Sequence, residues 1–320
     1  MPQTTVAQPQ PTMLTEAGWK TLLERIHEQK CTPFLGAEST GSVMPSRSSI
    51  AERWAKEFDF PFEDSSDLAR VAQFIATKMS DEMVPRAKIL EEIEKVPMPD
   101  FKSADEPHGI LASLPLPVYI TTDYHNFMFA ALKSYSKDAR QEFCRWNDAL
   151  NNPSLFDPSL FGTEAGKGEI SSFAPDVANP VVFHLYGHAG VEESLVLTED
   201  NYLQFLVETS KANLRIPARI QKAFALTSLL FLGYRLTDLE FRVLLRSLAG
   251  SLKISMAGSH VSAQVIHVGD EVQSDKQIAQ LAKTKEYLSG YCKAFHITTY
   301  WGTTHDFLVE LKQRWDAFPK

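Results

Sequence analysis

The chain has 320 residues with a formal net charge of −8 at pH 7, and 44% of them are hydrophobic. This length is enough for one large domain or two modest ones with a substantial buried core. The negative charge and the absence of a basic stripe argue against nucleic acid as a direct partner.

The N-terminal segment and the cysteines bear on location and metal content. Residues 1–13 lack the basic head and apolar core of a signal peptide, so we expect a disordered tail there. No apolar run is long enough to span a membrane. Cys31, Cys144 and Cys292 are widely spaced without any CxxC, which excludes a four-thiolate zinc site and is typical of a reducing cytoplasm. We therefore expect a cytoplasmic protein with neither a metal nor a membrane partner.

The first predicted elements have the order of a phosphate-binding loop. Helical spacing of apolar residues predicts a helix within 14–30 behind a Thr15 cap. A short strand then leads into the small and polar residues of "FLGAESTGS", and Ser49 with Glu52 predicts a capping box for a helix at 50–58. A strand, a small-residue turn and a helix in this order are typical of nucleotide-phosphate sites.

Helical patterns dominate the next part of the chain. They continue over 64–114, so we predict an inserted helical subdomain over 50–114. A strand follows at 117–121 and leads through a polar cluster into another helix. Residues 147–180 are rich in Asn, Pro, Ser and Gly without periodicity, which predicts a long loop or lid.

The remaining chain alternates strands with helices. "PVVFHLYGHAG" and "SLVL" predict strands, Thr198 predicts a helix cap, and Thr237 with Glu240 predicts a capping box after the apolar run "TSLLFLGY". Continuous apolar strands that alternate with helices are typical of a parallel sheet buried on both faces. We therefore predict an α/β fold over 14–320, with a Rossmann-like parallel sheet covered by helices on both faces.

Polar or small residues follow five of the predicted strands. In a parallel sheet these carboxyl ends share one edge, where open α/β sheets bind ligands. We expect a nucleotide crevice there, although the alternative that turns are polar everywhere stays open. The five segments are 36–41, 121–125, 186–188, 233–235 and 298–301.

These segments carry a family resemblance. The order of "FLGAEST", "YITTDYHNFM", "FHLYGH", "SLVLTEDNYLQFL" and "LLFLGYRLTDLEFRVLL" resembles the sirtuin-like domains of prokaryotic antiviral defence proteins over roughly residues 20–315. The resemblance implies an NAD-binding Rossmann sheet with a helical insertion, and cleavage of NAD to nicotinamide and ADP-ribose. Classical protein-deacetylating sirtuins carry a four-cysteine zinc module, which three cysteines cannot build. A zinc-containing deacetylase is therefore excluded.

The first departure from the family pattern lies in the phosphate loop. The family has Gly-Ala-Gly before a serine, whereas this chain has Gly36, Ala37 and Glu38, with Thr40 in the hydroxyl position. A glutamate beside the pyrophosphate costs roughly 1–4 kcal/mol, which corresponds to about tenfold to a thousandfold weaker NAD binding. The alternative is that Glu38 faces solvent.

The second departure follows the strand at 117–121. The family pattern Thr-Thr-Asn-Tyr-Asp is here Thr121, Thr122, Asp123, Tyr124 and His125. The resemblance implies that Thr122 and Tyr124 contact the ligand. An ionised Asp123 can only accept hydrogen bonds, yet its charge is suited to stabilising an oxocarbenium-like ribose or orienting the attacking water. The alternative is an ordinary N-cap for the following helix.

The third departure lies in "FHLYGH", where the family has Leu-His-Gly with that histidine as general base. Tyr186 stands in the place of the base, and a phenol with a reference pKa of about 10 is protonated at neutral pH. In a regular strand that continues past Gly187, His184, Tyr186 and His188 share one face, which makes His188 the best surviving base. A structural role stays open for His188 and is expected for His184.

Two further segments complete the predicted site. Gly233 and Tyr234 match a ribose or adenine contact of the family, and Arg235, which departs from the family serine, is expected to meet a phosphate. Thr298, Thr299 and Trp301 offer a place for a nucleotide base to pack, but we favour the alternative that Trp301 plugs the space between the sheet and the last helix.

Three functions follow from this pattern. The first choice is an NAD+ glycohydrolase in antiviral defence, with Asp123, His188 and Tyr186 as catalytic candidates. The alternatives are a domain that lost catalysis but still binds NAD, ADP-ribose or a partner protein, and an assembly scaffold that holds no nucleotide. NAD is thus expected as substrate or ligand, and a homo-oligomer or a larger defence assembly stays open.

Overall fold

A computed structural model describes residues 14–40, 43–157, 159–161, 173–210, 215–235, 241–246, 260–264 and 275–319. The predicted tail at 1–13 and the predicted capping box of Thr237 and Glu240 lie outside these residues.

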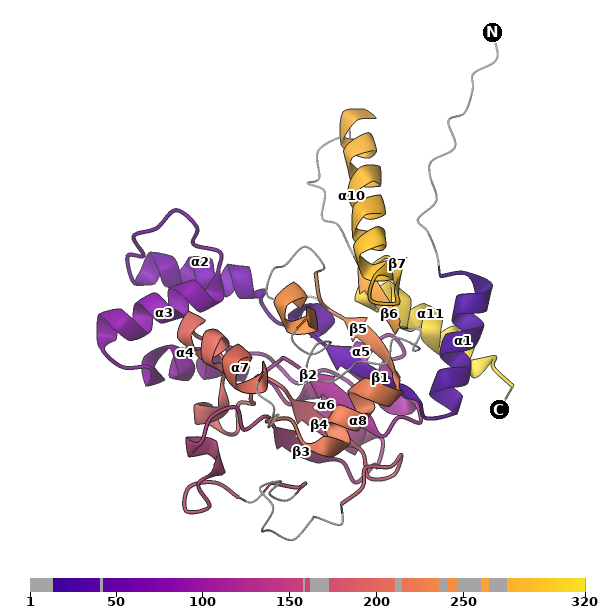
Figure 1. Cartoon of the computed structure of the whole chain (residues 1–320), viewed down its shortest axis with the longest axis horizontal. Helices are drawn as coiled ribbons and strands as arrows, with labels where there is room; N and C mark the ends of the chain where they lie inside the picture. The colour runs from indigo at the N-terminus through magenta and orange to yellow at the C-terminus, as the bar shows by residue number, and fades with distance from the viewer. Residues whose placement is uncertain are drawn as a thin grey trace.

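The described strands form one parallel sheet in the order β3-β4-β2-β1-β5-β6-β7 (Figure 1). β1 lies in the middle, beside β2 on one side and β5 on the other, so the chain reverses its direction of strand addition at β1. Such a reversal creates the crevice in which open α/β sheets bind ligands. The predicted Rossmann-like α/β fold is confirmed. The strands are β1 (Cys31–Leu35), β2 (Val118–Thr121), β3 (Arg140–Phe143), β4 (Val181–His184), β5 (Ser228–Leu232), β6 (His260–Gln264) and β7 (Ile297–Trp301).

Helices cover both faces of the sheet, as predicted. The face that carries Phe34, Phe183 and Phe231 packs against one set of helices, and the face that carries Leu35 and Tyr119 packs against another. The first set is α2 (Arg47–Glu57), α3 (Leu68–Met79), α4 (Met83–Glu94), α7 (Glu199–Ser210), α8 (Ala218–Leu226) and α10 (Asp275–Lys293). The second set is α1 (Glu16–His27), α5 (Pro107–Ser113), α6 (Phe127–Ser134) and α11 (Thr304–Asp316).

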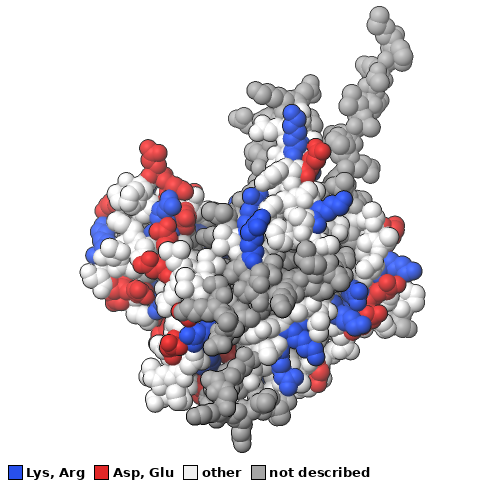
Figure 2. Space-filling view, in the orientation of Figure 1, with Lys and Arg blue, Asp and Glu red and all other residues white. Residues whose placement is uncertain are grey.

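The predicted insertion at 50–114 contributes to both of these layers. α2, α3 and α4 pack on one another and α3 packs on α7, whereas α5 packs on α6 and α11 at the opposite face. Residues 47–94 hold 11 acidic and 7 basic residues, which gives −4 of the net charge of −8. Acidic side chains accordingly gather at the α2–α4 end of the face in Figure 2. The domain boundaries themselves stay predictions.

Several local predictions are corrected by the structure. α2 begins at Arg47, because the hydroxyl of Ser46, not the predicted Ser49, accepts the capping hydrogen bond. β3 was not predicted, since its polar first half hides it in the sequence. Residues 195–197 are buried but form no strand, and the Val196 N–H donates to the Tyr186 carbonyl instead. The predicted caps at Thr15 and Thr198 are confirmed by hydrogen bonds of 3.1 and 3.2 Å.

Trp301 does not fill the space between the sheet and the last helix, α11, as we expected from the sequence. Side chains alternate across a strand, so Tyr300 and Trp301 point to opposite faces of the sheet. Tyr300 packs on Phe307 of α11, with 5.1 Å between the ring centroids. Trp301 belongs to the core on the α10 side, where the ammonium of Lys285 lies 5.5 Å from its ring centroid.

Within the described helices we find none whose length and apolar character would let it cross a lipid bilayer. α10 extends away from the rest of the molecule in Figure 1 and contacts β7 near its base.

Candidate functional site

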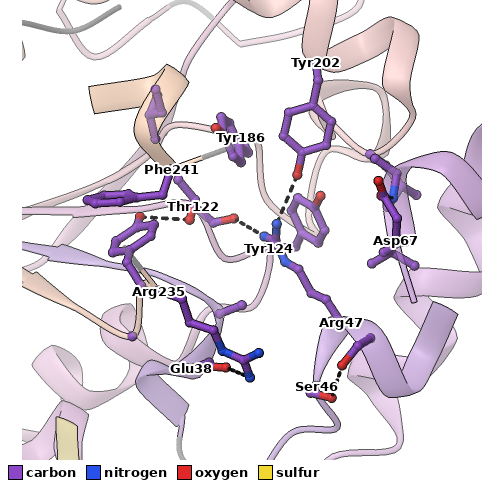
Figure 3. A pocket seen from close by; sticks show the side chains of 18 of the residues that line it. Glu38, Ser46, Arg47, Asp67, Thr122, Tyr124, Tyr186, Tyr202, Arg235 and Phe241 are labelled. Carbon is purple, nitrogen blue, oxygen red and sulfur yellow. Dashed lines mark hydrogen bonds and ion pairs between the residues drawn. The ribbon is translucent and has the colours of Figure 1, made fainter. Parts of the chain in front are cut away.

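A cavity of about 410 Å³ opens at the carboxyl ends of β1, β2 and β5, between these strand ends and helices α2, α3 and α7 (Figure 3). This volume lies within the range of small-molecule sites, roughly 300–1,000 Å³. Loops that are remote along the chain therefore meet around one space. Eight of the predicted site residues line it: Ala37, Glu38, Thr122, Tyr124, Tyr186, Gly233, Tyr234 and Arg235.

The loops after β1 and β5 are joined directly beneath the cavity. The Gly36 N–H donates to Leu232 O at 2.8 Å, and the Glu38 N–H donates to Gly233 O at 3.1 Å. Gly233 has φ +74°, and a Cβ there would lie 2.2 Å from the Ser39 nitrogen, so only glycine fits. Gly36 is held by its hydrogen bond to Leu232 O and does not line the cavity. Thr40 is buried within the turn Ala37–Thr40 and does not line the cavity either.

Glu38 and Arg235 form an ion pair at the cavity (Figure 3). The Glu38 side chain keeps 37% of its surface exposed and the Arg235 side chain 40%. Glu38 therefore both lines the cavity and reaches solvent, and its closeness to a pyrophosphate stays a prediction. Its charge is balanced by the arginine that was expected to meet a phosphate.

Arg47, which the sequence analysis missed, links three walls of the cavity. Its guanidinium donates to the Tyr202 hydroxyl and to Thr122 O, both at 3.0 Å, and lies 5.5 Å from the centroid of the Tyr124 ring. Figure 3 shows it reaching from α2 between these groups. The sequence does contain a signal for this residue. Ser46 stands three residues before Ser49, the spacing at which an N-cap side chain accepts a backbone N–H, and this places Arg47 in the first turn of α2.

Aromatic rings form much of the remaining wall. Tyr234 stacks on Phe241 with 4.6 Å between centroids, and its hydroxyl donates to Leu35 O while lying 2.9 Å from the Thr122 hydroxyl. Tyr186 packs edge-on against Tyr202 at 5.2 Å. Burial raises the pKa of Tyr234 well above its usual value, so this phenol stays neutral. Flat, uncharged rings are suited to contact a planar base.

Asp123 does not line the cavity, although both of its neighbours in the chain do. Its Oδ2 accepts a hydrogen bond from the Ser39 hydroxyl at 3.2 Å and lies 3.6 Å from His125 Nε2. Burial raises the pKa of Asp123 to about 6, against the opposing charges of Arg47 and His108 and the Ser39 hydrogen bond.

The alternative that Asp123 caps the next helix is wrong. The N-cap residue of α6 is Asn126, whose own side chain makes no capping hydrogen bond. The Phe127 N–H donates to His125 Nδ1 at 3.3 Å. Asp123 therefore belongs to a buried polar cluster under the loop.

His184, Tyr186 and His188 do not share one face. β4 ends at His184, and Gly187 has φ +81°, which interrupts the alternation of side chains. A Cβ on Gly187 would lie 2.2 Å from Ser194 O, so this turn requires glycine and Gly187 does not line the cavity. Tyr186 faces the cavity, whereas the two histidines lie elsewhere.

His188, the predicted base, packs outside the cavity. Its ring centroid lies 5.1 Å from that of His184 and 5.6 Å from that of Phe143. Burial lowers the pKa of His188, and it lowers that of His184 to about 3. No histidine is among the described residues that line the cavity.

Comparison with known protein families bears on this geometry. The sequence model of the SIR2-like domain family matches residues 117–287, which are 171 of the 320 residues. The chain belongs to the SIR2-like domain family. A search of curated proteins finds no match.

Family membership supports an NAD-related function and confirms the sirtuin resemblance. The matched span includes Thr122, Tyr186 and Tyr234, whereas Glu38 and Arg47 lie before it. Part of the cavity wall is therefore formed by residues that precede the span matched by the family model. The side chains that line the cavity are of the kinds that NAD requires. Aromatic rings can contact its bases, hydroxyls its riboses, and the two arginines its phosphates.

Metal ligands are not assembled in the part of the chain that the structure describes. No group of three or more His, Cys, Asp or Glu side chains there has the arrangement of a metal site. All three cysteines are buried, and burial raises the pKa of Cys31 to about 12 and that of Cys292 to about 11. These thiols are therefore protonated at neutral pH. The expectation of no metal stays a prediction.

Proposed function

We propose that the cavity binds NAD or ADP-ribose and that the chain acts as a nucleotide-recognising SIR2-like domain. The observation that carries this proposal is the convergence of the loops after β1, β2 and β5 on one space of about 410 Å³. The family supports the ligand class, because SIR2-like domains are NAD-related. The cavity offers rings for the bases and arginines for the phosphates.

NAD+ glycohydrolysis, with a role in antiviral defence, is the second candidate. It is favoured by Asp123, which lies in the loop between cavity-lining Thr122 and Tyr124 and has a pKa raised to about 6. A carboxylate beside the ribose stabilises the positive charge that develops when the nicotinamide bond breaks. This role requires Asp123 to leave Ser39 and turn into the cavity. Because the hydrogen bond to Ser39 must break first, we expect cleavage to be slow.

Two measurements on the full chain separate these functions. Ligand that binds only the folded protein raises its unfolding midpoint, so NAD and ADP-ribose should each raise it. Incubation with NAD at high protein concentration, followed by chromatography for nicotinamide, tests cleavage. A raised midpoint without nicotinamide supports the binding domain alone, and nicotinamide release supports the hydrolase.

A variant that narrows the cavity provides the control. Ala37 lines the cavity at the carboxyl ends of the strands. Ala294 is exposed just before β7 begins at Ile297, and so lies at the amino ends of the strands. Ala37→Phe should abolish the midpoint shift with either nucleotide, and Ala294→Phe should retain it. A shift that survives Ala37→Phe would place the nucleotide elsewhere.

The scaffold hypothesis predicts no shift with any nucleotide. Assembly into a homo-oligomer or a larger defence complex is a separate proposal, which light scattering coupled to size exclusion would test with and without NAD. Neither the hydrolase nor the binding domain depends on its result.

A further inference from the structure

The cavity is electrically neutral among its described lining residues. Arg47 and Arg235 bring two positive charges, and Glu38 and Asp67 bring two negative ones. Asp67 is the N-cap of α3, where its carboxylate accepts the N–H groups of Ala69 and Arg70 at 3.0 and 3.2 Å. Glu38 is thus the carboxylate of this set that is paired with a cavity arginine.

The loop after β1 has already used several of its backbone donors. The Gly36 N–H donates to Leu232 O at the end of β5, the Glu38 N–H to Gly233 O in the loop after it, and the Ser39 N–H to Gly36 O at 2.9 Å. A phosphate-binding loop normally turns such groups toward the ligand. Recognition of phosphate in this cavity must therefore depend more on the arginine side chains.

The two arginines differ in the partners that the described residues give them. Arg47 is fixed by hydrogen bonds to Tyr202 and Thr122, which join three walls of the cavity. Arg235 is 40% exposed and is paired with Glu38, which is 37% exposed. An ion pair with this much solvent exposure contributes little stability, so the cost of separating it is small. Arg235 is therefore the arginine that a ligand phosphate reaches by replacing a carboxylate.

We propose that Glu38 is a specificity-determining residue that competes with the ligand's phosphates for Arg235. This inference rests on the proposed binding of a nucleotide in the cavity. Every ligand with a pyrophosphate must break the Glu38–Arg235 pair and then lie beside the released carboxylate, whereas a nucleoside meets neither obstacle. Glu38 therefore reduces the preference for phosphorylated ligands, and it holds Arg235 in place when no nucleotide is bound.

The test measures Kd by calorimetry for ADP-ribose, AMP and adenosine, which share a base and carry two, one and no phosphates. Glu38→Gln keeps the size of the side chain and removes its charge. We expect it to tighten ADP-ribose binding by about tenfold to a hundredfold, AMP binding less, and adenosine binding by less than about twofold. The added affinity should fall as salt rises, because it is electrostatic.

Glu28→Gln is the matched control. Glu28 pairs with Lys30 at 3.1 Å and with Arg25 at 3.6 Å, and its side chain is similarly exposed (47%). It lies at the end of α1, on the opposite face of the sheet from α2 and α3. It should leave all three Kd values unchanged. When Glu38→Gln is added to an Arg235→Gln protein, the Kd for ADP-ribose should not change. That result would show that the effect of Glu38→Gln acts through Arg235.

The outcomes separate this inference from the proposed function. A Glu38→Gln protein that binds ADP-ribose and adenosine in the wild-type ratio would overturn the competition while leaving nucleotide binding intact. Binding of ADP-ribose by Glu38→Gln but not by wild type would support both. Absence of nucleotide binding in wild type and in every variant would overturn the proposed function, and this inference with it.

Discussion

The loop after β2 has two sides with different surroundings. Thr122 and Tyr124 line the cavity, whereas Asp123 and His125 lie in a buried cluster with Ser39. The departures from the sirtuin pattern divide in the same way, since Glu38 and Tyr186 face the cavity. Substitutions that look alike in the sequence therefore have different surroundings, an open cavity on one side and a buried polar cluster on the other.

The buried side shows two departures that are neighbours in space. The family's asparagine and aspartate are here Asp123 and His125, whose side chains approach to 3.6 Å. Burial, and then electrostatic interaction with His108, His184 and Arg47, lower the pKa of His125 well below its usual value. At neutral pH the pair is therefore a neutral imidazole beside a largely ionised carboxyl. The two substituted side chains therefore lie side by side in one buried cluster.

The largest effect is expected when both sides are restored at once. Asp123→Asn returns the buried position to the family pattern, and Tyr186→His puts an imidazole into the cavity, where the family has its base. General base catalysis contributes roughly a hundredfold to ten-thousandfold, so the double variant should cleave NAD at least about a hundredfold faster than wild type. Nicotinamide release measures the rate. An unchanged rate would count against the family alignment at these positions.

Removal of Arg47 should cost more stability than removal of another arginine from the same helix. Arg47→Ala loses two charged hydrogen bonds between separate elements and should lower the free energy of unfolding by about 1.5–3 kcal/mol. Arg53→Ala breaks an ion pair with Glu92 in which Arg53 is 48% exposed, and should cost less than about 1 kcal/mol. Urea unfolding of both variants checks this. Equal losses would mean that Arg47 does not join the cavity walls.

Replacement of Asp123 alone should change the pH dependence of stability. The folded pKa of about 6 lies above the unfolded value near 3.9, so an ionised Asp123 destabilises the fold above pH 6 and has no such effect below pH 4. Asp123→Asn should therefore be more stable than wild type at pH 8 by at most about 3 kcal/mol, and equally stable near pH 4. Urea unfolding across this range measures the difference. A constant difference at all pH values would mean that Asp123 does not titrate in this window.

The smallest effect is expected for Tyr186→Phe. The ring and its contacts with Tyr202 and Phe205 are retained, and a phenol with a reference pKa of about 10 is a poor base. Any NAD cleavage by the wild type should persist within about threefold, since a change of that size is under about 1 kcal/mol. If the variant loses cleavage while still binding NAD, Tyr186 takes part in the chemistry and the comparison of the two sides must be revised.

The sheet could be predicted because its central strands are continuous apolar runs separated by helical patterns. β1 and β5 are buried at every position, and both were expected. β3 could not be found this way, since its Arg140 is exposed and its Gln141 half-buried, as suits an edge strand. Its place is fixed by pairing with β4, which is a property of the assembled sheet.

The site could be predicted as far as the motifs follow strand ends. The orientation of each side chain could not, because it depends on contacts with remote segments. Gly187 adopts its positive φ where Ser194 packs against it, and this turn separates Tyr186 from His188. Tyr202 and Phe241 enter the cavity from helical segments whose patterns indicate only core packing. Arg47 was missed because the start of its helix was placed one turn too late.

The position of β1 in the sheet has a practical consequence for dividing this protein into pieces. β1 pairs with β2 and with β5, so it is the strand that holds the two halves of the sheet together. A fragment cut to the family match at 117–287 would lack β1 and also β7, so β2, β5 and β6 would each have an unpaired edge, and such edges are prone to aggregate. The unit that folds is therefore longer than the unit that sequence comparison detects, and expression of the shorter one should give insoluble protein.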